Sequence, residues 1–384
     1  MELLAENIAN ALLNVLPPQK KIFPLHEPFF DGNEWNYVKE CIDTGWVSSA
    51  GQFVNKFEEL LALYTGAKYA IAVVNGTAAL HICLKLAGVK NNDEVIIPAL
   101  SFVATANAVS YCGAIPHFAD SEEKTLGIDP SKLEDYLNDI AIVRSNQCIN
   151  KFSGRIIRVI APVHTFGHPV DLDAIKNLCE RFSLILIEDA AESLGSFYKG
   201  YHTGTYGLLS ALSFNGNKTV TTGGGGAILT NDKHLAEYAK HLTTTAKKIH
   251  PWDYYHDEIG YNYRMPNINA AIGCAQLELL SEMIQKKRAL AKKYAKAFQL
   301  LKGVRFFLEP EHAKSNYWLN CILLNNSTIS NIEPVLKTLH SSGIMARPAW
   351  KLLDSLPMYN NCPKMDLSFD KQIVQKLINI PSSV

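Results

Sequence analysis

The chain has 384 residues, with 37 lysines and arginines balanced by 37 aspartates and glutamates. A chain of this length buries enough surface to fold without disulfides or metals, and its balanced charge offers no field for nucleic acid or anionic lipid. The hydrophobic share of 47% and the charged share of 19% are typical of a globular protein and exclude a disordered one.

The N-terminal residues 1–20 are expected to form a short amphipathic helix that stops before Pro17. Glu2 and Glu6 stand where a secretory signal would carry basic residues. The eight cysteines are scattered without a C-x-x-C pair, which favours a reducing compartment. The most apolar stretch, residues 69–88, is interrupted by polar side chains. We therefore expect a cytoplasmic protein without membrane or nucleic-acid partners.

From about residue 69 to residue 230, short apolar runs alternate with amphipathic stretches. This pattern predicts an α/β fold with a mostly parallel sheet. A crossover helix is expected over residues 171–182, with Asp171 as its cap. The strands show little alternation, as expected where helices cover both faces of a sheet. The expected strands cover residues 70–74, 94–99, 158–164, 184–189, 208–214 and 226–230.

The character of the sequence changes beyond Thr243, where a polar and aromatic stretch has neither a helical nor a strand period. We therefore expect a large domain over residues 21–250 and a smaller α+β domain over residues 251–384. The smaller domain is expected to contain a strand within residues 316–324 and helices over residues 269–301, 332–341 and 370–378.

The first candidate site motif is Asn75-Gly76-Thr77, which joins an expected strand to a helix. The unpaired N–H groups of a helix start can bind a phosphate, and the threonine adds a hydroxyl donor. A simple N-cap gives the same pattern. The motif is weak when taken alone.

The second candidate is Asp189, within the run Glu188 to Glu192 at the carboxyl end of a very apolar strand. Sheets of this class place their ligands at this edge. A buried carboxylate is costly unless it meets a cation or several donors. A protonated pyridine nitrogen would satisfy Asp189, and a structural salt bridge or a helix cap would do so equally well.

The third candidate is Lys218, which closes the run Ser213-Phe214-Asn215-Gly216-Asn217-Lys218 and precedes four glycines. An amine beside side-chain-free backbone, with a hydroxyl five residues upstream, suits a Schiff base to an aldehyde cofactor whose phosphate lies near Ser213. A solvated loop lysine beside a flexible hairpin is the plainer alternative. The glycines do not form a dinucleotide fingerprint.

The phosphate motif, the aspartate and the lysine, in this order along one α/β domain, form a recognisable combination. The sequence resembles the pyridoxal-phosphate-dependent nucleotide-sugar aminotransferases of the DegT family, whose fold is aspartate-aminotransferase-like (fold type I). Within the family it is most similar to the enzymes of the legionaminic acid pathway. The similar segments include GWVSSAG, IEDAAESLGS, SFNGNK, GYNYRMPNINAAIGCAQL, RPAW and INIPSS.

The resemblance implies that pyridoxal 5'-phosphate is the cofactor and that Lys218 forms the Schiff base with it. Asp189 would pair with the pyridine nitrogen and keep it protonated, so that the ring accepts electrons released at the donor's Cα. Phe102 would stack on the ring face. Together these three side chains would hold and activate the ring.

The family pattern also implies a phosphate site made by Gly76, Thr77 and Ser213. Asn262 of a neighbouring subunit would reach the same phosphate. The active unit would therefore be a homodimer with shared active sites.

Two positions depart from common family sequences. Glu192 stands where many relatives have glutamine or histidine near the cofactor's phenolic oxygen, and a second anion there would be repelled unless it were protonated or turned away. Gly224 stands where many relatives have glutamate, so that one acidic contact to the substrate is removed.

Other residues have competing interpretations. His164 and His168 are four apart, but Gly167 and Pro169 make the segment a loop, so no metal site is expected. His164 could approach the cofactor or be a structural histidine. Five further residues could contact sugar or nucleotide, and they would also suit a dimer interface. They are Trp46, His256, Arg264, Arg347 and Trp350.

The resemblance implies a transamination with L-glutamate as donor and C4 of a nucleotide-linked 4-keto-6-deoxy-N-acetylhexosamine as acceptor, in amino-sugar biosynthesis. Family members that dehydrate sugars carry histidine in place of the lysine, so Lys218 argues against that reaction. The alternatives are an aminotransferase for 3-keto sugars, an aminotransferase of the perosamine type, and a non-catalytic regulatory protein that retains the cofactor.

Overall fold

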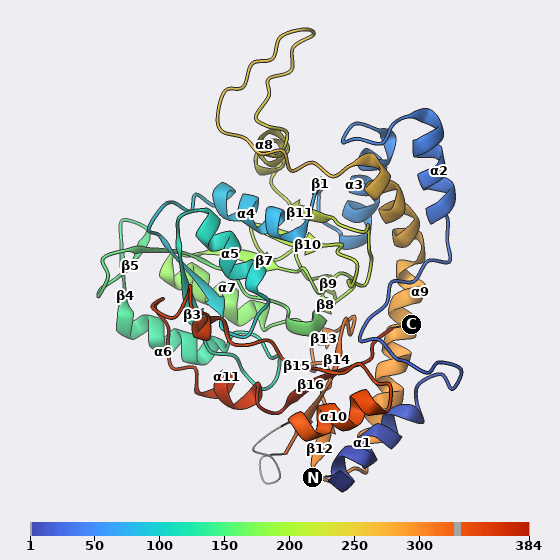
Figure 1. Cartoon of the computed structure of the whole chain (residues 1–384). Helices are drawn as coiled ribbons and strands as arrows, with labels where there is room; N and C mark the ends of the chain where they lie inside the picture. The colour runs from blue at the N-terminus through green and yellow to red at the C-terminus, as the bar shows by residue number, and fades with distance from the viewer. Residues whose placement is uncertain (1, 326–331, 384) are drawn as a thin grey trace.

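The computed structural model describes residues 2–325 and 332–383. Its largest feature is a nine-stranded mixed sheet whose main path runs β1-β11-β10-β7-β6-β2-β3, with the β4–β5 hairpin attached to β6 (Figure 1). The strands are β1 (Tyr69–Val73), β2 (Glu94–Pro98), β3 (Ile115–Ala119), β4 (Ala141–Arg144), β5 (Gln147–Asn150), β6 (Ile156–Ile160), β7 (Ile185–Asp189), β10 (Leu209–Ser213) and β11 (Gly226–Thr230).

The neighbours from β10 to β3 on this path are parallel, whereas β11 runs antiparallel to both β10 and β1. As a result, β1, β7 and β10 all end at the same edge of the sheet. Each of the six expected strands is present, although β6 ends at Ile160 rather than continuing to residue 164. The strands β3, β4 and β5 were not predicted.

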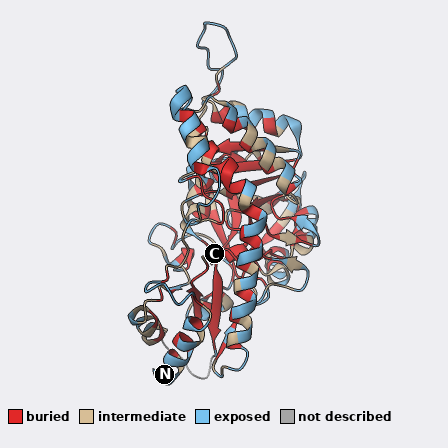
Figure 2. Cartoon of the chain, turned by 90° about the vertical axis from the view of Figure 1, so that its right-hand side faces the viewer, coloured by how far each residue is buried: buried red, intermediate tan, exposed pale blue. Residues whose placement is uncertain are grey.

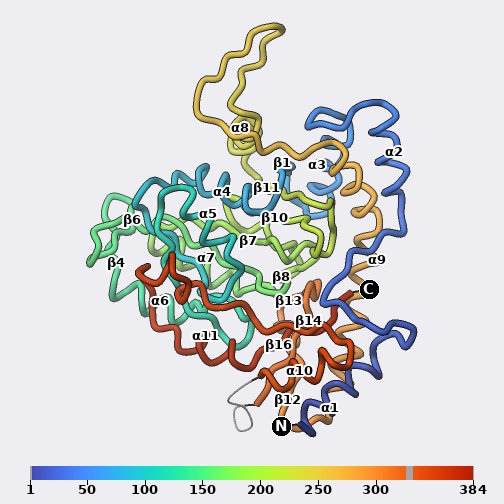
Figure 3. The backbone as a smooth tube through the Cα atoms, viewed as in Figure 1, coloured from blue at the N-terminus to red at the C-terminus, as the bar shows by residue number. Residues whose placement is uncertain are grey.

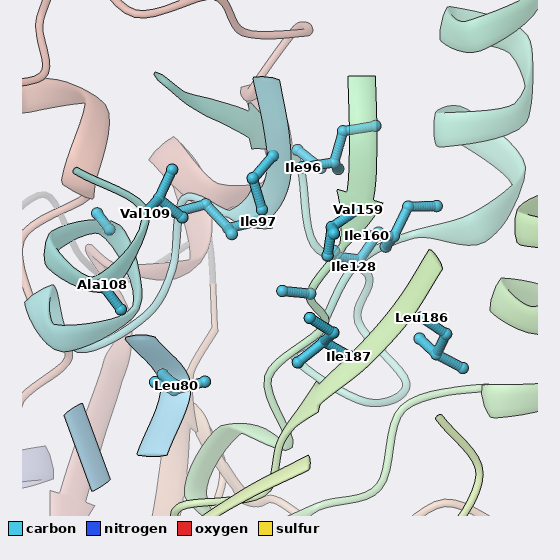
Figure 4. Packing of buried hydrophobic residues seen from close by; sticks show 14 of the residues in the cluster. Leu80, Ile96, Ile97, Ala108, Val109, Ile128, Val159, Ile160, Leu186 and Ile187 are labelled. Atoms are coloured by element: carbon cyan, nitrogen blue, oxygen red, sulfur yellow. The ribbon is translucent and has the colours of Figure 1, made fainter. Parts of the chain in front are cut away.

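Helices pack on this sheet and complete a core of aliphatic side chains. The close-up in Figure 4 shows part of this core, with Leu80 and Val109 from helices and Ile97, Val159 and Ile187 from strands. The predicted crossover helix is confirmed, and the Asp171 carboxylate accepts from the N–H of Ala174. The helices of this part are α2 (Glu34–Thr44), α3 (Gln52–Thr65), α4 (Gly76–Leu86), α5 (Val103–Tyr111), α6 (Pro130–Ile140), α7 (Leu172–Phe182) and α8 (Lys233–Thr243).

A second, four-stranded antiparallel sheet has the order β12-β14-β16-β15. The expected helix over residues 370–378 is wrong in its second half, because the buried apolar side chains from Leu377 to Ile380 pair as a strand with β14. The elements of this part are α1 (Glu2–Leu13), β12 (Val304–Phe306), β14 (Asn320–Leu324), α10 (Glu333–Ser341), β15 (Arg347–Pro348), α11 (Ser368–Ile373) and β16 (Leu377–Ile380).

The long helix α9 (Asn267–Phe298) runs beside both sheets (Figures 1 and 3). Its first part packs on α2 and α3, and its last part packs on α1 and β12. Burial along α9 is striped, with exposed side chains on the outer face (Figure 2). The predicted domain boundary at residue 250 stays a prediction. Shorter elements are η1 (Thr165–Gly167), η2 (Leu353–Ser355), β8 (Phe197–Tyr198), β9 (Tyr201–His202) and β13 (Ala313–Lys314).

The segment between α8 and α9 projects from the body as a long loop (Figure 1). It contains neither a helix nor a strand, as its lack of period predicts. Several large apolar side chains on it are exposed, among them Ile249, Trp252 and Tyr254. Within the described part of the chain, no helix combines the length and apolar character that a membrane span requires.

Candidate active site

A cavity of about 340 Å³ opens where β1, β7 and β10 end, between the start of α4 and the start of α5. Parallel α/β sheets bind their ligands at the carboxyl ends of the strands, which is the position of this cavity. The cavity therefore gathers side chains that are far apart in the sequence. Eight of the predicted site residues line it: Gly76, Thr77, Phe102, Asp189, Glu192, Ser213, Lys218 and Trp350.

Lys218 lies in the turn between β10 and β11, where its N–H donates to the carbonyl of Asn215 at 2.9 Å. Its side chain is 13% exposed. The amine lies 3.4 Å from Oε1 of Glu192 and 3.7 Å from the centroid of the Trp318 ring. The amine thus faces the cavity between a carboxyl group and an aromatic face, both of which attract a cation.

Asp189 is the last residue of β7, and its carboxylate is buried. Oδ2 accepts from the hydroxyl of Thr105 at 2.7 Å, and Oδ1 accepts from the N–H of Ala191 at 3.2 Å. Burial nevertheless raises the pKa of Asp189, because desolvation outweighs these donors and the charge of Lys218. A cation placed against this carboxylate would be favoured.

Glu192 lines the same cavity and is buried, and its Oε2 accepts from the N–H of Phe166 at 2.8 Å. Desolvation raises the pKa of Glu192 to about 7, against the opposing effect of Lys218. A carboxyl group with this pKa carries a proton for part of the time near neutral pH. The repulsion expected from a second anion at this position is correspondingly reduced.

The start of α4 forms an anion cradle. The Asn75 side chain caps the helix by accepting from the N–H of Ala78 at 2.8 Å. The N–H groups of Gly76 and Thr77 belong to the first turn, where no intrahelical acceptor exists. A Cβ at Gly76 would lie 2.8 Å from Cβ of Ser213. Only glycine allows the Ser213 hydroxyl to approach the helix start this closely.

Aromatic side chains form one wall of the cavity. Trp350 lies 4.9 Å from Phe166 and 6.3 Å from Phe102, measured between ring centroids. Phe102 is 54% exposed, so one of its faces is available to a ligand. Trp318 completes the lining, and its indole N–H donates to the carbonyl of Asn217 at 2.6 Å. Neither Trp318 nor Thr105 was predicted from the sequence.

The structure does not bring the other predicted contacts into this cavity. The ring of His164 is fully buried, with Nε2 3.1 Å from Oε2 of Glu188 and Nδ1 accepting from the N–H of Val170. These contacts favour the structural interpretation of His164, and its approach to the cofactor stays a prediction. The residues outside the cavity lining are Trp46, His164, His256, Asn262, Arg264 and Arg347.

Trp46 is exposed and lines a different hollow, together with Cys41 and Asn267. His256 is exposed, and its Nδ1 lies 2.7 Å from the carbonyl of Thr245. Asn262 is exposed at the base of the projecting loop. Its contact with the phosphate of a second subunit stays a prediction.

His241, Asp257 and Glu258 form the one group of side chains with metal-ligand spacing in the described residues. Asp257 is already engaged by His241 at 2.7 Å and by Lys248 at 2.6 Å. Lys248 lowers the pKa of Asp257 to about 2. An ion-pair cluster on the surface accounts for these three residues.

The cavity fits a specific kind of ligand. The α4 cradle suits a phosphate group, Asp189 suits a protonated ring nitrogen, and the exposed face of Phe102 suits a flat ring. The amine of Lys218 can form a bond with an aldehyde. A phosphorylated pyridine aldehyde combines all four features.

Known proteins are similar to this chain in sequence and in fold. The model of the "DegT/DnrJ/EryC1/StrS aminotransferase family" matches residues 29–384. The chain is 40% identical over 343 residues to EpsN of Bacillus subtilis (strain 168), which carries the name of a pyridoxal phosphate-dependent aminotransferase, with 89% of this chain and 84% of EpsN covered. It is 39% identical to a GDP-perosamine synthase of Escherichia coli O157:H7, with 88% of each covered.

Solved structures agree with these sequence relatives. One of them is Helicobacter pylori PseC, an aminotransferase involved in the biosynthesis of pseudoaminic acid. It is similar with a TM-score of 0.83 and 27% identity, and 94% of each chain is covered.

Proposed function

Because this chain belongs to the DegT/DnrJ/EryC1/StrS aminotransferase family of pyridoxal phosphate-dependent enzymes, we propose that it aminates a nucleotide-linked ketosugar. The proposed donor is L-glutamate. The proposed acceptor position is C4 of a 4-keto-6-deoxy-N-acetylhexosamine, as in the legionaminic acid pathway. The observation that carries the proposal is the placement of Lys218, Asp189 and the α4 cradle around one cavity.

Bound pyridoxal 5'-phosphate supplies an aldehyde that takes up an amino group and a ring that accepts the electrons released at the donor's Cα. The chain's own residues have to hold that ring and move protons. The Asp189 carboxylate would pair with the ring nitrogen and would stabilise its protonated form. The hydroxyl of Thr105 and the N–H of Ala191 fix the orientation of the carboxylate.

Lys218 acts as the proton carrier in this proposal. Its amine accepts a proton from Cα of the donor and returns a proton during the second half of the reaction, as general base and general acid. Glu192 is 3.4 Å from the amine and can share its proton, because the pKa of Glu192 is raised to about 7. The aromatic wall around Trp350 limits the access of water.

The N–H groups of Gly76 and Thr77 and the hydroxyl of Ser213 bind the cofactor phosphate in this proposal. Phe102, which is 54% exposed, would stack on the ring.

A second copy of the chain is proposed to complete the site. Lys218 is the one cationic side chain among the described residues that line the cavity. The cofactor phosphate, the donor carboxylates and the nucleotide diphosphate all carry negative charge and call for further positive or donor groups. Asn262, from the partner subunit in the family pattern, would supply one of them. We propose a cytoplasmic homodimer, in keeping with eight free cysteines.

A sugar without the N-acetyl group is the second candidate. GDP-perosamine synthases from three bacteria are 39%, 37% and 33% identical to the chain, and they favour a perosamine-type acceptor. A 3-keto sugar and a non-catalytic regulatory role remain alternatives to be excluded by assay.

The experiment is incubation of the holoenzyme with glutamate and a panel of UDP- and GDP-linked ketosugars, with and without N-acetyl groups. Mass spectrometry detects amination, and NMR of the product identifies the carbon. The proposal predicts formation of a C4 amino sugar together with 2-oxoglutarate. Amination of 3-keto sugars alone would contradict the C4 assignment, and a lack of turnover with every sugar would contradict the enzymatic role.

A further inference from the structure

Lys287 of α9 is buried, although none of the ion pairs among the described residues includes it. Its amine lies 2.6 Å from the carbonyl oxygen of Ser382, 3.2 Å from that of Trp318 and 3.0 Å from Nε2 of His26. Three segments that are distant in the sequence therefore meet at one nitrogen. Buried lysines usually need a carboxylate partner, so this arrangement requires an explanation.

The hydrogen bonds suit a neutral amine. A neutral amine has two donors for the two carbonyl groups and one lone pair for an N–H at Nε2 of His26. With the hydrogen on Nε2, the other ring nitrogen of His26, Nδ1, is an acceptor without a partner. A charged amine would instead leave Nδ1 as a buried N–H without an acceptor, and such orphaned donors are rarer. Burial also lowers the pKa of Lys287 to about 7.

One of the two carbonyl groups that Lys287 contacts belongs to Trp318, whose indole ring covers the amine of Lys218. Trp318 is fixed at three points: its carbonyl by Lys287, its N–H by Oδ1 of Asn316 at 2.8 Å, and its indole N–H by the carbonyl of Asn217 at 2.6 Å. With these contacts, the ring centroid lies 3.7 Å from the amine of Lys218. An ammonium group this close to an indole face is stabilised by cation–π attraction.

We propose that Lys287 is a positioning residue for the reaction: it fixes the Trp318 backbone so that the indole keeps its place against the amine of Lys218. This role rests on the proposed function of Lys218. Lys287 itself lies outside the cavity lining and acts through Trp318. The indole face then covers one side of the amine, which lies 3.4 Å from Oε1 of Glu192.

The test measures the reactivity of Lys218 in cofactor-free protein, where turnover plays no part. Each variant is treated with trace acetic anhydride at pH 7, and peptide mass spectrometry gives the labelling rate of Lys218. Lys287→Met and Trp318→Leu should each raise this rate about 2- to 30-fold, the equivalent of losing a cation–π contact. The matched control Lys286→Met removes an exposed neighbour that pairs with Glu282, and it should leave the rate unchanged.

The double variant Lys287→Met/Trp318→Leu should label no faster than Trp318→Leu alone, because both changes remove the same contact. Parent-like labelling of Lys287→Met, or full additivity in the double variant, would overturn the proposal. Lys287→Gln, which keeps an amide donor, should give an intermediate rate. Loss of native circular dichroism in both Lys287 variants would show a purely structural role and would also overturn it. Failure of the proposed function appears separately, as absence of a cofactor link to Lys218 in the parent protein.

Discussion

The amine of Lys218 lies 3.4 Å from the carboxyl group of Glu192, and both side chains are largely buried in the same cavity. Glu192 is also held by the N–H of Phe166. The pair places a proton donor and a proton acceptor side by side at the end of β10. In the proposed function, proton transfer at Lys218 would therefore involve Glu192 as well as the lysine.

Asp189→Asn should slow amination by about 10²- to 10³-fold, because an amide cannot balance the charge of a protonated ring nitrogen in a buried site. The measurement is kcat with saturating glutamate and sugar. Asp173→Asn is the matched control, since Asp173 forms an exposed ion pair with Lys199. An unchanged kcat in Asp189→Asn would remove Asp189 from the mechanism.

Glu192→Gln should change how stability depends on pH in cofactor-free protein. Glu192 binds its proton more tightly in the folded chain, where its pKa is about 7, than at the ordinary value of 4.5. This group therefore lowers the free energy of unfolding as pH rises from about 4.5 to about 7. Glu192→Gln lacks this effect. The free energy of unfolding of the variant, relative to that of the parent, should therefore rise by about 1–3 kcal/mol between pH 5 and pH 8.

Urea denaturation at both pH values checks this expectation. Glu237→Gln is the control, because Glu237 is exposed and pairs with Lys233 on α8. A constant difference between parent and Glu192→Gln across this range would mean that the Glu192 carboxyl titrates normally.

Gly76→Ala should weaken cofactor binding. The added methyl group would lie 2.8 Å from Cβ of Ser213 and 3.2 Å from its hydroxyl. Relieving this overlap costs about 1–3 kcal/mol, which corresponds to about 5- to 150-fold in Kd. Gly216→Ala, where a Cβ meets no atom within 4 Å, should bind as the parent does. Equal Kd values by absorbance titration would argue against the α4 cradle.

Lys287→Met should remove a pH dependence of stability that the parent shows above neutrality. The pKa of Lys287 falls from 10.5 to about 7 on burial, so the unfolded chain binds the extra proton between these values. Its contribution to the free energy of unfolding rises with pH over this window, by at most ~1.4 kcal/mol per pH unit. His26, the titratable group in contact with Lys287, has its pKa lowered well below 6.5.

Urea denaturation of parent and Lys287→Met at pH 7 and pH 9 provides the measurement. The parent should gain stability relative to the variant over this range. A parallel course of the two curves would indicate that Lys287 is charged in the folded protein.

The core of the α/β fold could be predicted because its strands are apolar and contain many β-branched residues. The rule that ligands bind at the carboxyl edge pointed to Asp189, and the family resemblance placed Lys218 in the same site. The strand β3 was missed because Pro116 interrupts its pattern and His117 hides its burial, which depends on a contact with Glu94 at 2.9 Å. The strand β16 was mistaken for a continuation of α11, because a short apolar run fits both the helical and the strand period.

The rest of the site depends on contacts that no local pattern reveals. Trp318 has the sequence character of a core residue before β14, and only the packing of the two sheets places it on Lys218, which is 100 residues away. Lys287 stands among several lysines of α9, a residue type that is ordinarily solvated, so its burial could not be read from the sequence. His164 was a candidate because it follows β6, yet its ring is engaged by Glu188.

The central claim is that Lys218 forms the covalent link to pyridoxal 5'-phosphate, and peptide mapping tests it most directly. Holoenzyme is reduced with borohydride, digested and analysed by mass spectrometry. The account predicts a pyridoxyl group on the peptide that contains Lys218 and its loss in Lys218→Ala, whose amination rate should fall at least ~10³-fold. A pyridoxyl group on another lysine, or parent-like amination by Lys218→Ala, would contradict it.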